Sequence, residues 1–209
     1  MFHKSFYSLK NKTIIATSSI YQLNLLQATL TITVFFVLVT AYIVSDFSLI
    51  SVFQNSHTSK PLIYKITGTW GNHEGSLLLW INIMVIFSYI FFIINKNQPD
   101  YQLITLVIQN ILILGFFLFL IFNSNPFTLI FPTPKNGLGL NPILQDPALA
   151  IHPPLLYIGF VGSSIFFSAA LAALITNFKG NKFAASIKPW VFITWTFQTL
   201  GIIVGSIWA

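Results

Sequence analysis

Residues 76–94 read SLLLWINIMVIFSYIFFII, and residues 101–122 read YQLITLVIQNILILGFFLFLIF. Neither stretch contains a charged residue, and each is close to the roughly 20 apolar residues that a helix needs to cross a bilayer. The whole chain has 209 residues, of which 55% are hydrophobic and 7% charged, and its mean hydropathy is +0.79. Because a soluble domain carries about 25% charged residues, this composition predicts an all-α, polytopic helical membrane protein.

Working outward from these two stretches, we expect five transmembrane helices. They fall at about residues 25–45, 76–94, 101–122, 154–175 and 190–208. Residues 1–24 are more polar, carry three lysines and lack the apolar core and small-residue cleavage site of a signal peptide. The chain is therefore divided into a polar N-terminal segment, 1–24, and a membrane domain, 25–209.

The lysines predict the orientation of these helices. Seven of them, at positions 4, 10, 12, 96, 179, 182 and 188, fall on one side of the membrane, and three, at 60, 65 and 135, on the other. Under the positive-inside rule the N-terminus faces the cytoplasm or matrix. The two longer connections, 46–75 and 123–153, then face the periplasm or the intermembrane space. Scattered loop lysines of this kind indicate a lipid bilayer as the partner and no nucleic acid.

Several kinds of chemistry are disfavoured by what the chain lacks. It has no cysteine, so it supplies no thiol, disulfide or thiolate ligand. All histidines and carboxylates lie at or beyond the ends of the expected spans, namely His3, His57, His73, His152, Asp46, Glu74, Asp100 and Asp146. An ionisable group in mid-membrane usually marks an ion path. A proton pump or charge-coupled transporter is therefore disfavoured, and the chain alone cannot ligate a haem between its spans by histidine.

The first candidate site is GTWGNHEGS at residues 68–76, directly before the second span. Trp70 suits the headgroup layer, and the neighbouring His73 and Glu74 could bind a ligand or contact a partner. The simpler interpretation is a loop that leads into the helix and carries an aromatic anchor.

The second candidate site is LNPILQDPALAIHPPLLY at residues 140–157. Asp146 followed by a proline is typical of a helix N-cap and first helical position, which predicts a short helix running toward His152. Pro153 and Pro154 should break that helix, and Pro154 should begin the fourth span. A histidine held on such a stiff backbone suits an axial haem ligand. The simpler interpretation is an interfacial histidine that is hydrogen-bonded to a loop carbonyl.

The tryptophans of the last expected span predict two environments. Trp190, near the end of the span, is typical of an interfacial anchor. Trp195 lies deeper, so we expect it to pack against another helix or a flat ligand.

Four segments in order carry a resemblance to a known family. They are TWGNHEGSLLLW at 69–80, SNPF at 124–127, the run at 141–159 and the run at 189–206. Together they resemble the N-terminal part of the CcmF family, the haem lyases of the System I cytochrome c maturation pathway.

The resemblance implies a site. In that family a tryptophan-rich "WWD" segment on the outer side holds haem between two axial histidines, and His152, in the HPPLLY motif, matches the first of them. Gln145 and Asp146 would then order the loop before it, while His73 and Glu74 would shape the nearby outer surface. The WWD segment would begin just after residue 209, and the second axial histidine and the histidines of the family's own b-type haem are missing. We therefore expect a split or truncated form.

The resemblance also implies a function: one subunit of a haem lyase that helps hold haem for attachment to apocytochrome c, whose two thiols join the haem vinyl groups. The implied partners are a second CcmF-type chain bearing the WWD segment, the haem chaperone, thiol-handling subunits and apocytochrome c. The chain uses Phe, Ile, Asn and Lys heavily, and the codons for these residues are rich in A and T. This usage favours an organellar genome, and hence the mitochondrial inner membrane with the His152 loop in the intermembrane space. The alternative location is a bacterial inner membrane. The alternative function is a non-catalytic structural subunit of a respiratory or biogenesis assembly.

Overall fold

The computed structural model describes residues 14–95, 98–142 and 145–208, and the described part is built from helices. The long helices are α2 (Ile14–Val44), α5 (His73–Ile94), α6 (Pro99–Asn123), α7 (Pro147–Phe160), α8 (Ser164–Thr176) and α9 (Asn181–Trp208). Two short helices, α3 (Ile50–Asn55) and α4 (Leu62–Gly68), lie between α2 and α5. The 3-10 turn η2 (Val161–Ser163) joins α7 to α8.

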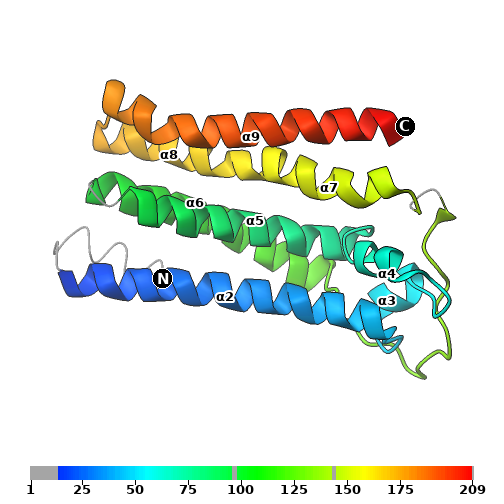
Figure 1. Ribbon diagram of the computed structural model, residues 1–209. Coiled ribbons are helices and arrows are strands. Elements are labelled where there is room, and N and C mark those ends of the chain that lie inside the picture. Colours follow the sequence, from blue (N-terminus) through cyan, green and yellow to red (C-terminus); the bar gives the residue numbers. More distant parts are fainter. Residues whose placement is uncertain (1–13, 96–97, 143–144, 209) are drawn as a thin grey trace.

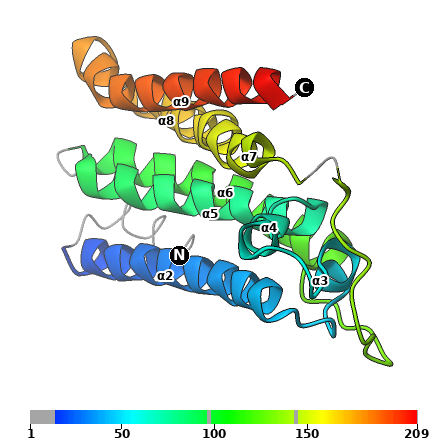
Figure 2. The same cartoon turned by 45° about the vertical axis from the view of Figure 1, so that its right-hand side comes forward.

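Five helical segments are long and apolar enough to cross a membrane. They are Ser19–Val44, His73–Ile94, Pro99–Asn123, Ala150–Thr176 and Asn181–Ile207. Figures 1 and 2 show them side by side as an elongated bundle, with α5 and α6 between α2 and the α7–α9 pair. The prediction of an all-α membrane protein with five spans is confirmed.

The expected spans begin too late in the sequence, most of all those of α2 and α9. Helix α2 begins at Ile14, so residues 14–24 are part of the first long helix; the first 13 residues of the expected polar segment lie outside the described part. Helix α9 begins at Asn181 and continues through Pro189. Polar residues at the ends of these helices extend past the apolar core, and hydropathy alone does not detect them.

The two long connections meet at one end of the bundle, which we call the loop end (Figure 1, right). The Ser51 hydroxyl donates to the Pro126 carbonyl at 2.7 Å, and the Thr58 N–H donates to the Asn136 side chain at 3.1 Å. Helices α5 and α8 end, and helices α6 and α9 begin, at the opposite end. The expectation that both long loops share one side is therefore confirmed, while the compartment they face stays a prediction.

A polar cluster joins the helices in the middle of the bundle. Gln109 on α6 is fully buried; its amide donates to the Ser164 hydroxyl at 2.9 Å, and its carbonyl accepts from the Ser168 hydroxyl at 2.8 Å. Since polar side chains hydrogen-bond across helices in membranes, this cluster holds α8 against α6. It helps fix the position of the α7–α8 segment, which carries His152.

Candidate functional site

Helix α7 begins as the sequence predicts. The Asp146 carboxylate accepts the Ala148 N–H at 2.7 Å, and the Asp146 backbone carbonyl accepts the Ala150 N–H at 3.0 Å. The predicted N-cap is confirmed, with Pro147 as the first helical residue. Before the cap, the Gln145 side-chain amide donates to the Leu140 carbonyl at 3.1 Å. Both residues therefore order the segment that leads to His152.

The expected break at Pro153 and Pro154 is wrong, because both prolines lie inside α7, which runs unbroken to Phe160. His152 is thus a residue of the membrane helix and does not sit at the end of a separate short one. Prolines remove N–H donors from a helix, but in membrane helices neighbouring groups can satisfy the carbonyls left behind. Here the Trp70 indole N–H donates to the Ala150 carbonyl at 3.0 Å.

The His152 imidazole points from α7 toward α9. Its Nδ1 lies 2.7 Å from the Gly201 carbonyl oxygen. A carbonyl only accepts, so Nδ1 carries the proton and donates it. The ring also lies against Gly205, where an added Cβ would come within 2.6 Å of the His152 Cε1. The simpler interpretation placed this histidine on a loop carbonyl; the acceptor is instead a helix carbonyl 49 residues away in the sequence.

Glycines bring α7 and α9 unusually close along their length. A Cβ at Gly201 would lie 2.7 Å from the Leu156 backbone nitrogen, and one at Gly159 would lie 2.4 Å from that of Gln198. Gly201 and Gly205 form a small-xxx-small pattern, which lets membrane helices approach closely. This pattern is visible in GIIVG at 201–205 and was missed in the sequence analysis.

His73 is the first residue of α5 and belongs to a different set of contacts. Asn72 caps this helix by accepting the Gly75 N–H at 2.8 Å, and Glu74 lies in the first turn. The His73 Nδ1 lies 3.1 Å from the Ser124 hydroxyl, and its ring meets Phe119 edge to face. The first candidate segment is therefore a capped helix start, as its simpler interpretation expected.

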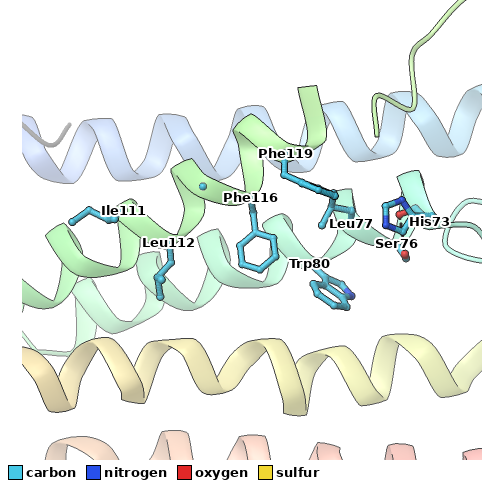
Figure 3. A pocket seen from close by; sticks show the side chains of 9 residues that line it. His73, Ser76, Leu77, Trp80, Ile111, Leu112, Phe116 and Phe119 are labelled. Carbon is cyan, nitrogen blue, oxygen red and sulfur yellow. Dashed lines mark hydrogen bonds between the residues drawn. The ribbon is translucent and has the colours of Figure 1, made fainter. Parts of the chain in front are cut away.

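Two cavities adjoin His73. The larger, about 500 Å³, is an apolar groove between α5 and α6, with His73 and Ser76 near one end (Figure 3). Its walls include Leu77, Trp80, Phe116 and Phe119. The smaller, about 270 Å³, lies between the two candidate segments and is lined by residues of both, including Trp70, His73, Ala150, Pro153 and Tyr157.

The structure therefore brings some of the predicted site residues together and separates others. Trp70, His73 and Pro153 share the smaller cavity, whereas the His152 ring turns to the α9 face of α7. Glu74 lines neither cavity. Within the described residues, His, Asp and Glu side chains form no group of three that could hold a metal ion.

The chain matches the family model described as "Cytochrome C assembly protein" over residues 70–209. It is similar to the cytochrome c-type biogenesis protein CycK of Rhizobium meliloti, with 50% identity over 84% of this chain and 26% of the relative. It is also similar to the cytochrome c-type biogenesis protein CcmF of Escherichia coli, with 44% identity over 84% of this chain and 27% of the relative. The chain thus spans about a quarter of the length of these curated relatives.

A solved structure, titled "Cytochrome c Heme Lyase CcmF", has the same fold. Its TM-score to this chain is 0.83 at 24% sequence identity, and the match covers 99% of this chain and 33% of that one. The similarity confirms the helical membrane fold.

Proposed function

The chain belongs to the cytochrome c assembly protein family, and we propose that it is the N-terminal membrane part of a CcmF-type haem lyase, in which it helps hold haem for attachment to apocytochrome c. The names of its relatives support a role in cytochrome c biogenesis. The remaining three quarters of their length, on this polypeptide or another, would supply the rest of the site.

The observation that carries the proposal is the state of His152. Donation from Nδ1 to the Gly201 carbonyl sets the tautomer in which Nε2 holds the lone pair. Histidines that bind metals commonly donate their other ring N–H to a carbonyl in this way, which fixes the ring and raises its basicity. The chemistry of this imidazole fits an axial ligand to the iron of haem, the substrate of the lyase.

The chain's own residues would act by binding and orienting haem. Asp146 and Gln145 fix the start of α7, and Gly201 and Gly205 fix the His152 ring against α9. In the reaction each thiol of apocytochrome c adds across a haem vinyl group: a carbon–sulfur bond forms, and the thiol hydrogen passes to the other vinyl carbon. This chain has no cysteine, so both thiols come from the substrate.

Partners and location follow from the same proposal. We place the protein in an inner membrane with the loop end on the outer side, as the lysine distribution favours. A mitochondrial inner membrane is our preferred setting, and the bacterial relatives support an inner membrane in general. The proposed partners are a WWD-bearing CcmF-type chain or segment, the haem chaperone, thiol-handling subunits and apocytochrome c.

The test is a pair of histidine substitutions in the assembled lyase. His152→Ala should greatly reduce the haem retained on the outer side, because alanine offers no donor atom. His73→Ala is the matched control and should retain more haem, since the described contacts of His73 lie toward α6 and Ser124.

The measurement is the haem absorption spectrum of the complex purified in mild detergent, at equal chain abundance by immunoblot. Added imidazole should partly restore the His152→Ala spectrum. A wild-type spectrum from His152→Ala would refute ligation by His152 and leave it as a helix-packing residue, which favours the structural-subunit alternative.

A further inference from the structure

The two adjacent prolines of α7 affect one carbonyl more than any other. In a helix, the carbonyl of residue i accepts from the N–H of residue i+4, or of i+3 in a tighter 3-10 turn. For Ala150 these donors would be residues 154 and 153, and both are prolines without an N–H. Ala150 is buried, at 8% exposure. An unsatisfied carbonyl at such a place is strongly unfavourable, most of all within a membrane.

Trp70 supplies the missing donor. Its indole N–H donates to the Ala150 carbonyl at 3.0 Å, across 80 residues of sequence. Phe35 of α2 fixes the position of the indole, because the two rings stack with centroids 6.5 Å apart and planes inclined by 19°. Its own backbone N–H donates to the Thr67 carbonyl at 3.2 Å. The hydrogen bond therefore connects α7 to a site anchored on α2 and on the end of α4.

The position of this bond relative to His152 suggests its purpose. Ala150 is two residues before His152, and Ala150 and Pro153 face the cavity that Trp70 lines. The His152 ring faces the other way, toward the Gly201 carbonyl on α9. The start of α7 is thus held from two sides, by Trp70 on one and by α9 on the other.

We propose that Trp70 is a positioning residue for His152: it replaces the helix donors that Pro153 and Pro154 remove, and so keeps the His152 imidazole in register with Gly201 and Gly205. This inference rests on the proposed function for the identity of the ligand that His152 holds. It assigns Trp70 a hydrogen-bonding role in addition to the membrane-anchoring role that its type suggests.

The test restores the donor by a second route. Trp70→Phe keeps an aromatic ring against Phe35 but removes the indole N–H. Pro154→Ala returns an N–H to the position that serves the Ala150 carbonyl within the helix. In the assembled lyase, Trp70→Phe should lower the haem bound per chain and shift its ligand-field spectrum at equal abundance, and Trp70→Phe/Pro154→Ala should restore both. Trp190→Phe is the matched control, because this tryptophan packs against Phe87 and Phe91 in the half of α9 away from Gly201 and Gly205.

A second measurement does not depend on haem. The chain has no cysteine, so Ala150→Cys gives a single buried thiol at the start of α7. In detergent, the reaction of this thiol with a maleimide should become roughly tenfold faster when Trp70→Phe is added, because losing one hydrogen bond to a buried group makes local opening about that much more frequent. Adding Pro154→Ala as well should slow the reaction again.

The proposal is overturned if Trp70→Phe changes neither measurement, or if Pro154→Ala fails to restore them. It is also overturned if labelling quickens while the haem spectrum stays the same, because Trp70 would then only stabilise the helix. An absence of haem from the wild-type assembly would refute the proposed function instead, and the labelling rates would still decide whether Trp70 holds the start of α7.

Discussion

The close contact between His152 and Gly205 makes Gly205→Ala a sharp perturbation. The new Cβ would lie 2.6 Å from the His152 Cε1 and 2.8 Å from Nδ1. Carbon atoms in contact lie about 3.5–4.0 Å apart, so the ring must move by about 1 Å or the helices must separate. The 2.7 Å bond from Nδ1 to the Gly201 carbonyl would then exceed hydrogen-bonding length.

The expected magnitude combines three terms. Overpacking a closely packed contact costs about 1–3 kcal/mol, and loss of the hydrogen bond costs about 1 kcal/mol. Replacing a helical glycine by alanine returns about 0.5–1 kcal/mol. We therefore expect Gly205→Ala to destabilise the protein by about 2 kcal/mol and to reduce the haem that we propose His152 to hold.

The control is Gly115→Ala on α6, where an added Cβ meets no atom within 4 Å. It should be neutral or stabilising by up to about 1 kcal/mol. The assay is reversible unfolding in mixed micelles, followed by far-ultraviolet circular dichroism, together with the haem spectrum of the assembled complex. If Gly205→Ala matches Gly115→Ala in both measurements, the proposed packing of His152 on α9 is wrong.

Two further predictions concern the loops. Single cysteines at Thr133 and Asn181, both exposed and at opposite ends of the bundle, should label from opposite sides of the membrane with an impermeant reagent, and labelling from one side would contradict the topology. Burial lowers the pKa of Lys60 from 10.5 to about 8, so the folded state loses this proton before the unfolded state does, and stability should rise between about pH 8 and 10.5. Thermal unfolding across that pH range should show the rise in stability in the wild type and in the control Lys135→Met, and a much smaller rise in Lys60→Met. An unchanged rise in Lys60→Met would exclude Lys60 as its source.

The helical architecture could be predicted from the sequence because it depends on local properties of the chain. Span length and apolarity predict the five membrane helices, since the thickness of the bilayer sets the length and its hydrocarbon core requires apolar side chains. The Asp146 cap was equally predictable, because the groups that form it lie within a few residues of one another. The same local logic failed at Pro153 and Pro154, where a donor from a distant segment allows the helix to continue.

Which way each side chain faces could not be read from the sequence. We predicted an interfacial anchor at Trp190, but this side chain is 3% exposed and packs against Phe87 and Phe91. We also predicted that Trp195 packs against another helix or a flat ligand; it is 65% exposed on the described chain, so its packing stays a prediction. In a membrane helix lipid-facing and protein-facing sides are both apolar, so hydrophobic periodicity carries little information about orientation.

The sequence by itself determined the class of the protein, its five spans and the two segments that supply the candidate site. Only the tertiary structure decided that the His152 ring meets Gly201 and Gly205 of α9 and that Trp70 completes the hydrogen bonding of α7. The physical reason is that a span requires only local length and apolarity, whereas an imidazole or an indole finds its partner on another helix. The identity of that helix depends on how all five pack together.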